Sequence, residues 1–214
     1  MSGGRRCAAR LVLGLLLLSG CSILSPRPDP SRFFTLTPIA EPGPNPGALA
    51  GHVLGVGPIT FPPYLDRPEL VTRVGPNEVR SAASDYWAGS LAKQFETTLS
   101  HDLQALLGPS SVQSYPWYAG GQPDLVVEAD VAQFERAIDG QAHLRALWRL
   151  RKASGEVLRA GESNLARSAA PDAGSTVATL SELLGQFSRE LTDAIRETTS
   201  STQRMAPNPA SKSR

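Results

Sequence analysis

Three long alternating segments, joined by two-residue turns, constrain the fold of this chain more than any other feature. They span residues 125–138, 141–152 and 156–167. The dipeptides between them, Asp139-Gly140 and Ser154-Gly155, are typical of β-hairpin turns. The pattern therefore predicts three long strands in an antiparallel meander.

The middle segment shows how this meander divides into a dry and a wet face. One side of its alternation is apolar: Ala142, Leu144, Ala146, Trp148 and Leu150. The other side is polar: Gln141, His143, Arg145, Arg149 and Arg151. Because successive strand residues point to opposite faces, the apolar set belongs to the core. The basic set is an ordinary solvated strand face or, alternatively, a surface for lipid headgroups or an acidic partner.

Two segments have helical periodicity. The first covers residues 89–107, with Asp85 as the expected cap and Gly108-Pro109 as the stop; its stripe is Leu91, Phe95, Leu99, Leu103 and Leu106. The second covers residues 176–198, where Thr179 and Glu182 resemble a capping box. Its stripe is Val177, Leu180, Leu184, Phe187, Leu191 and Ile195.

Shorter strands are expected before the meander, at residues 32–37, 52–60, 69–74, 78–82 and 111–115. Both helical stripes need an apolar surface to cover, and the dry side of the sheet provides one. The predicted fold class is therefore α+β: an antiparallel sheet with two long helices packed on one face.

The amino terminus has the layout of a secretion signal. Arg5, Arg6 and Arg10 precede an apolar run, Leu11 to Leu18, and small residues follow. This run is far shorter than the roughly 20 residues that span a bilayer.

The signal ends in Leu18-Ser19-Gly20-Cys21, which resembles the lipobox of bacterial lipoproteins. The resemblance implies that the chain is cut before Cys21 and that this residue receives a diacylglycerol and an acyl chain such as palmitate. A plain signal with a chance cysteine is the alternative. Two or more acyl chains anchor a protein stably, whereas one does not. Ser22 favours delivery to the outer membrane, facing the periplasm, over retention in the inner membrane.

The expected organisation follows from these features. Residues 1–20 are a signal that is removed, 21–31 a lipidated, proline-containing tether, 32–198 one α+β domain, and 199–214 a disordered polar tail. This length is ample for one hydrophobic core.

Charge and cysteine content exclude several classes of function. Without the three signal arginines, 18 basic and 20 acidic residues remain, a net charge of −2 that argues against nucleic acid as a partner. Cys7 leaves with the signal and Cys21 is consumed by lipid, so no disulfide or cysteine metal site is expected.

The histidines do not suggest a metal or catalytic site. His52, His101 and His143 lack the spacing of metal ligands, and the pair His101-Asp102 fits a solvated helix better than a catalytic pair. The sequence therefore predicts no catalytic residue, no metal and no cofactor.

The segment Tyr64 to Arg73 reads Tyr-Leu-Asp-Arg-Pro-Glu-Leu-Val-Thr-Arg and follows Val56 to Pro63. It resembles the PqiC/YmbA family of ABC-type transport auxiliary lipoproteins. The likeness continues through Tyr86-Trp87-Ala88, Pro123-Asp124-Leu125 and Phe134. It departs from the family at Gly89-Ser90, where acidic and apolar residues are usual.

The resemblance implies an accessory, non-enzymatic role in an MCE-type system that moves lipids between the two membranes. The implied partners are an MCE-domain substrate-binding protein and a membrane permease, and a homo-oligomeric ring is also implied. The alternative is an assembly or chaperone lipoprotein for an outer-membrane complex, and a periplasmic hydrolase is a weaker rival.

Three prolines stiffen the segment around Tyr64 and suit it to recognition. The residues expected to meet a partner are Tyr64, Leu65, Asp66, Arg67 and Arg73. Alternatively, Asp66 and Arg67 pair with the chain itself to fix the loop. The aromatic turn from Tyr115 to Tyr118 is the next candidate for contact.

Overall fold

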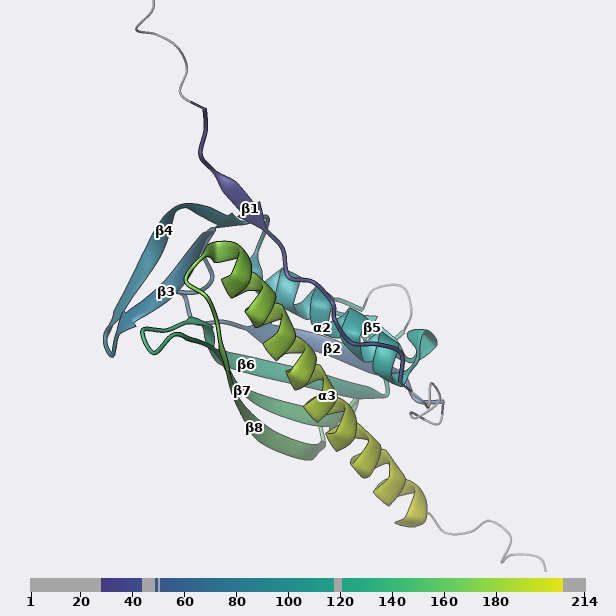
Figure 1. The fold of residues 1–214 in the computed structure, drawn as a ribbon. Coiled ribbons are helices and arrows are strands. Elements are labelled where there is room, and N and C mark those ends of the chain that lie inside the picture. Colours follow the sequence, from purple (N-terminus) through teal and green to yellow (C-terminus); the bar gives the residue numbers. More distant parts are fainter. Residues whose placement is uncertain (1–27, 44–48, 50, 118–120, 206–214) are drawn as a thin grey trace, which may run out of the picture. The chain divides into compact units, whose positions relative to one another are not determined.

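Eight strands form one sheet, and two helices pack on one face of it (Figure 1). The strands are β1 Arg32–Phe34, β2 Leu54–Thr60, β3 Glu69–Gly75, β4 Glu78–Trp87, β5 Val112–Ser114, β6 Leu125–Arg136, β7 Gln141–Lys152 and β8 Val157–Ser168. The helices are α2 Leu91–Leu107, the short 3₁₀ turn η2 Pro109–Ser111, and α3 Ala173–Met205.

The structure is a computed structural model that describes residues 28–43, 49, 51–117 and 121–205. The signal segment, Cys21, most of the tether and residues 206–214 lie outside the described residues, so the predictions made for them stay predictions. Within the described part of the chain, no helix is long and apolar enough to span a membrane.

The predicted α+β class is confirmed, but the sheet is mixed rather than antiparallel throughout. β6, β7 and β8 form the expected antiparallel meander, and β3 and β4 form a second antiparallel hairpin. β2, however, pairs in parallel with both β5 and β6, and β1 pairs in parallel with β4. The chain between β2 and β5 includes α2, which is long enough for the crossover that a parallel pair needs.

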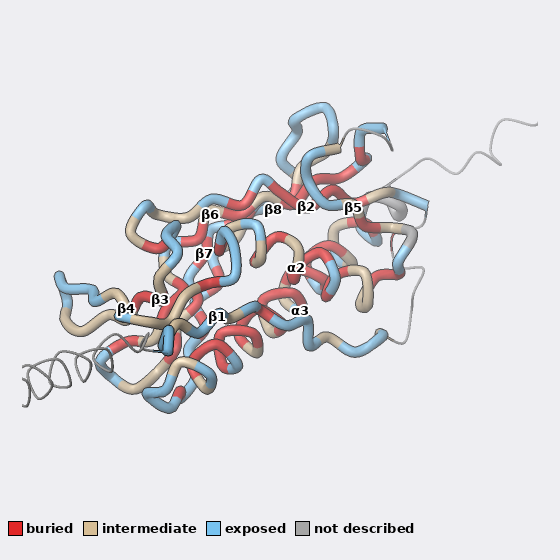
Figure 2. The backbone as a smooth tube through the Cα atoms, turned by 90° about the horizontal axis from the view of Figure 1, so that it is seen from above, coloured by how far each residue is buried: buried red, intermediate tan, exposed pale blue. Residues whose placement is uncertain are grey.

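The alternation of β7 produces the expected dry and wet faces. Its apolar set is buried: Ala142, Leu144, Ala146, Trp148 and Leu150 are each 0–8% exposed. Buried and exposed positions alternate along β7, and Figure 2 shows buried positions in the sheet and in both helices. Apolar burial between helices and sheet therefore supplies the main stabilisation of the domain.

The helix starts differ from the sequence predictions. The cap of α2 is Ser90, whose hydroxyl accepts from the Lys93 N–H at 3.4 Å. Asp85 lies in β4 instead and pairs with Arg32 of β1 at 2.7 Å. α3 begins before Thr179, at Ala173, where the Asp172 carboxylate accepts from the Ser175 N–H at 2.8 Å.

α3 also continues past residue 198, the predicted end of the domain, to Met205. Hydroxyl groups along its last turns bond back to carbonyls four residues earlier, as Thr199 does to Ile195 and Ser201 does to Glu197. Residues whose hydroxyl groups bond to the helix backbone are polar and form no apolar stripe. Hydrophobic periodicity alone therefore could not predict these last turns.

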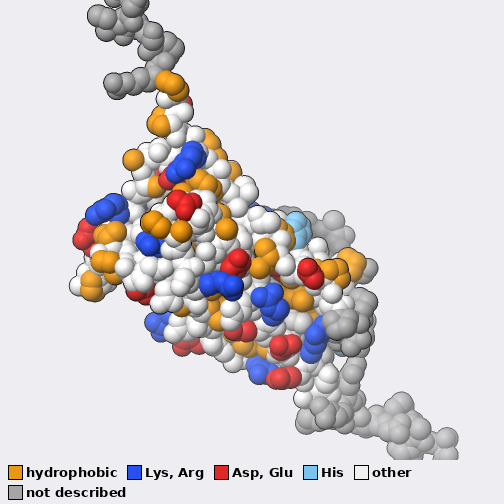
Figure 3. Space-filling view, viewed as in Figure 1, with side chains coloured by type: hydrophobic (Ala, Val, Ile, Leu, Met, Phe, Trp, Pro, Cys, Tyr) orange, Lys and Arg blue, Asp and Glu red, His pale blue; other side chains and the backbone are white. Residues whose placement is uncertain are grey.

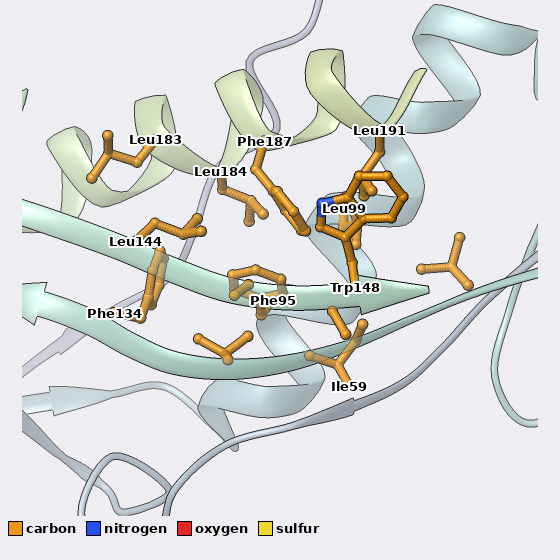
Figure 4. Close-up of a cluster of buried hydrophobic side chains, with 14 of the residues drawn as sticks. Ile59, Phe95, Leu99, Phe134, Leu144, Trp148, Leu183, Leu184, Phe187 and Leu191 are labelled. Atoms are coloured by element: carbon orange, nitrogen blue, oxygen red, sulfur yellow. The ribbon is translucent and has the colours of Figure 1, made fainter. Parts of the chain in front are cut away.

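Three phenylalanines form the centre of the core (Figure 4). Phe95 of α2 lies edge-to-face against Phe134 of β6, with ring centroids 5.2 Å apart, and 6.2 Å from the ring of Phe187 of α3. All three are at most 1% exposed. This arrangement joins both helices to the sheet at one point, in a geometry that aromatic rings prefer.

Residues 36–43, here called the strap, run between α2 and α3 without regular secondary structure (Figure 1). Their backbone N–H groups donate to groups on the helices: Leu36 to Gln94, Thr37 to Ser181, Ile39 and Ala40 to Asp102, and Gly43 to the Ala105 carbonyl. The strap lies so close to α3 that a Cβ at Gly185 would collide with Ile39. Groups on the helices, mostly side chains, thus replace a strand ladder as its backbone partners.

Candidate functional site

The loop after β2, residues 61–68, takes its shape from backbone hydrogen bonds. The N–H groups of Leu65 and Asp66 both donate to the Pro62 carbonyl, at 2.9 and 3.2 Å, and the Trp87 N–H donates to Pro68 at 2.7 Å. The first two bonds close the turn, and the third fastens it to the end of β4. A loop fixed at both ends loses little conformational freedom when it binds a partner.

Two of the expected partner-binding residues meet around a buried carboxylate. Arg73 donates from Nε to Glu135 at 2.9 Å and from Nη2 to the Tyr64 hydroxyl at 3.0 Å. The Tyr64 hydroxyl also lies 3.4 Å from Glu135 and 3.3 Å from the Ala132 carbonyl. The guanidinium sits over the Tyr64 ring, 5.5 Å from its centroid. Tyr64 and Arg73 are therefore held to the chain itself.

Burial and charge act together on this network. The Glu135 side chain is 1% exposed, and that of Arg73 is 26% exposed. Burial raises the pKa of Tyr64, and the nearby Glu135 charge raises it further against the opposing effect of Arg73. Burial acts to lower the pKa of Arg73, but the hydrogen bonds and charges of Glu135 and Tyr64 together outweigh it, so this pKa is also raised. The phenol thus stays protonated, and the guanidinium charged, well above neutral pH.

The remaining three expected residues divide between core and surface. Leu65 is 2% exposed, lies in the hydrophobic core and offers no surface to a partner. Asp66 and Arg67 are exposed. Arg67 pairs with Glu69 at 2.8 Å, and this bond lowers the pKa of Glu69. Arg67 therefore pairs within the chain, as the alternative interpretation expected. The charged groups of Asp66 and Arg67 nevertheless remain exposed to solvent.

Asp66, Arg67 and Pro68 of the loop line a shallow groove of about 360 Å³. Trp87 at the end of β4, with Gly89 and Ser90 before α2, completes its lining. The groove thus lies between the stiff loop and the start of α2. In the sequence, these two segments were separate motifs of the family resemblance. We call this surface, lined by residues 66–68, 87, 89 and 90, the loop groove.

Glu135 is the functional-site residue that sequence reasoning missed. The register of β6 against β7 shifts between Val131 and Gln133, so the alternation changes phase there. Phe134 then faces the helices, and Glu135 faces the opposite side, beneath Tyr64 and Arg73. A glutamate directly after the core residue Phe134 was the available signal, but the bulge before it determines which face it occupies.

The arginines of β7 are paired with acidic residues on the neighbouring strands: Arg145 with Glu162, Arg149 with Asp130, and Arg151 with Glu128. The His143 ring lies beside Asp139 of the turn before β7. The side-chain distances are 2.6–2.9 Å. This pattern favours the interpretation of a solvated strand face over a cationic surface for lipid headgroups.

Two other sequence candidates have structural settings of their own. His101 is exposed, while the carboxylate of its neighbour Asp102 is buried and occupied by the strap. In the aromatic turn, Tyr115 is 42% exposed and Trp117 packs against it and beside Gly55. Tyr118 lies outside the described residues.

The same fold occurs in solved structures of low sequence identity. A Xanthomonas campestris protein of family DUF330 matches with a TM-score of 0.69 and 17% identity, covering 82% of this chain and all of the other. An uncharacterised protein matches with a TM-score of 0.62 and 19% identity, covering 77% of this chain and 98% of the other. No curated protein matches the sequence.

The fold is thus that of a small α+β domain with a proline-containing loop after β2. The model of the ABC-type transport auxiliary lipoprotein components matches residues 34–192, and the chain belongs to this family. It is therefore a membrane-anchored lipoprotein that accompanies a transport system.

Proposed function

We propose that this protein is a non-enzymatic subunit of an MCE-type intermembrane lipid transport system. In this proposal it is anchored in the outer membrane through Cys21 and faces the periplasm, where it docks or completes the conduit and so supports membrane integrity. The observation that carries the proposal is the family match, which spans the domain from β1 to α3. An MCE-domain protein and a permease are the proposed partners.

The buried carboxylates support a role without catalysis. Asp102 accepts from two strap N–H groups, Glu135 accepts from Arg73, and Glu96 accepts from Lys93. Each group therefore has a structural task inside the domain. General acid–base catalysis needs such a group within reach of a substrate proton, and these carboxylates are occupied by the chain itself.

The loop groove is the proposed docking surface for the MCE-domain protein. It combines two exposed charges, Asp66 and Arg67, with the fixed backbone of the loop. Arginine is enriched at binding hot spots, and preorganised loops lose less entropy on binding. Tyr64 and Arg73 then act from behind, by holding the loop in its binding shape.

The first prediction concerns this surface. Replacing Asp66 and Arg67 together by serine should weaken capture of the partner from crosslinked envelopes by roughly 30-fold, the equivalent of one hot spot of about 2 kcal/mol. Thermal stability should change little, because both side chains are exposed.

The matched control is the pair Arg145→Ser and Glu162→Ser, which removes another exposed ion pair on β7 and β8. Equal capture by both double variants would place the contact elsewhere, with the Tyr115 turn the next surface to test. Recovery of an outer-membrane assembly machine, instead of MCE-domain and permease proteins, would favour the chaperone alternative.

The second prediction concerns the anchor. A Cys21→Ser chain should carry no acyl label and should leave the membrane fraction, because its lipid attachment point is gone. The measurement is metabolic labelling with a fatty acid, followed by membrane fractionation. Continued labelling of the serine variant would disprove the lipobox interpretation.

The third prediction concerns assembly. An accessory that acts by geometry is expected to form a closed homo-oligomer, since identical subunits close most simply into rings. Multi-angle light scattering of the purified protein should give one mass above that of the monomer. A monomer at all concentrations, with and without the partner, would remove the ring from the proposal.

A further inference from the structure

The N-terminal end of the domain carries an exposed aromatic pair. Phe33 of β1 is 67% exposed, and its ring stacks on Tyr86 of β4 with centroids 5.7 Å apart. The two residues are direct neighbours in the parallel register of β1 and β4. An exposed phenylalanine held by a second ring presents a preformed apolar surface at no cost in loop ordering.

A shallow groove of about 450 Å³ adjoins this pair and extends the apolar surface along α3. Phe33, Phe34 and Ile39 line one side, and Val177 and Ala178 line the other. Figure 3 shows hydrophobic side chains gathered at this end of the domain. We call the aromatic pair and this groove the N-terminal patch.

The charges at the patch are already compensated. Glu182, which lines the groove, pairs with Arg167 at 2.7 Å. Arg32 pairs with Asp85 at 2.7 Å, and its guanidinium also lies over the Phe34 ring, 5.6 Å from the centroid. An apolar surface could therefore approach without leaving an unpaired charge behind, which would be costly.

The N-terminal patch lies close in the sequence to Cys21, the proposed lipid attachment site, and this indicates which surface it contacts. Phe33 is separated from Cys21 by only twelve peptide steps. A chain of that length spans at most about 40 Å when fully extended and roughly 20 Å as a flexible coil. Whatever its path, the tether keeps Phe33 close to the lipid surface at high effective concentration, so weak apolar contacts suffice to hold it there.

We propose that the N-terminal patch rests on the phospholipid surface in which Cys21 is anchored, with Phe33 as the inserting side chain. The inference rests on the proposed anchor and adds a second, non-covalent membrane contact to it. Aromatic and aliphatic side chains are the groups that lie in the interface of peripheral membrane proteins. The domain is thereby oriented relative to the membrane, instead of moving freely on its tether.

The test uses the lipidated full chain in vesicles of phosphatidylethanolamine and phosphatidylglycerol. Thr35 is exposed in the groove wall, so Thr35→Cys provides the attachment point for an environment-sensitive fluorophore. The only natural cysteines are Cys7 and Cys21, so the lipidated chain offers no competing thiol. Val157→Cys is the control, because Val157 is 53% exposed at the start of β8 and does not line the groove.

The Thr35 label should become roughly twofold brighter and shift to shorter wavelength on vesicles, as expected for entry into the interface. The Val157 label should keep its aqueous spectrum. Adding Phe33→Ser should return the Thr35 label to the aqueous spectrum while the melting temperature stays unchanged.

Vesicle flotation separates failure of the contact from failure of the anchor. A protein that floats while its Thr35 and Val157 labels behave alike would overturn the membrane contact and leave the anchor intact. A protein that does not float would overturn both. A Thr35 shift without lipid that disappears on dilution would identify a second copy as the occupant and overturn the proposal.

Discussion

Arg73→Ala is expected to lower the free energy of unfolding by about 3 kcal/mol, because it leaves the Glu135 carboxylate buried without its charged partner. The estimate is taken at the low end for a broken buried pair, since the Arg73 side chain is still 26% exposed. Tyr64 loses its donor from Arg73 in the same step, which loosens the loop. Urea denaturation of the purified protein measures the loss.

Arg67→Ala is the matched control for this prediction. Arg67 belongs to the same segment and also pairs with a glutamate, but both partners are partly open to solvent. Its loss should cost far less than the loss of Arg73, as is usual for a surface pair. Adding Glu135→Gln to Arg73→Ala should restore part of the stability by removing the uncompensated charge. Equal costs for the two arginine variants would show that Glu135 is accessible to water.

Asp102→Ala is the second variant with a large expected effect. The side chain is fully buried and accepts from the N–H groups of Ile39 and Ala40, both at 2.9 Å, and from the Ser188 hydroxyl at 3.2 Å. Hydrogen bonds to a charged acceptor contribute more than neutral ones, so the expected cost is about 3 kcal/mol. The strap should detach and become the first site of proteolytic cleavage.

His101→Ala serves as its control, because His101 is the exposed neighbour on the same helix. That variant should keep both its stability and its resistance to protease. Asp102→Asn should fall between the two, since the amide retains one acceptor oxygen but lacks the charge. A strap that stays protected in Asp102→Ala would show that packing of Leu36 and Ile39, rather than the carboxylate, holds it in place.

Local patterns were enough to predict the meander and both helices, but not the neighbours of β2. The alternation of residues 141–152 and the turn at Asp139-Gly140 act over short distances, and the structure confirms them. β2 looks like an ordinary short strand, and nothing within it indicates that β5 and β6 will flank it in parallel. That pairing depends on the crossover through α2, which is a property of the whole chain.

The sequence predicted the stiff loop of the candidate site but not the buried glutamate at its centre. The prolines around Tyr64 indicated a stiff loop, and the loop is fixed by backbone bonds. Glu135 escaped notice because a bulge changes the phase of β6 before it. The strap was equally invisible, since backbone groups that bond to side chains such as Asp102 impose no period on the sequence.

The strap also determines the order in which this fold can be completed. A ribosome makes the strap early and α3 last, yet Thr37 donates to Ser181, a residue 144 positions later in the chain. β1 likewise cannot pair with β4, nor β2 with β6, until those later strands have been synthesised. Closing such distant contacts is slow, because the entropy of long loops must be overcome first. The bond from the strap to α3 therefore cannot form until synthesis is nearly finished, whereas its bonds to α2 can form earlier.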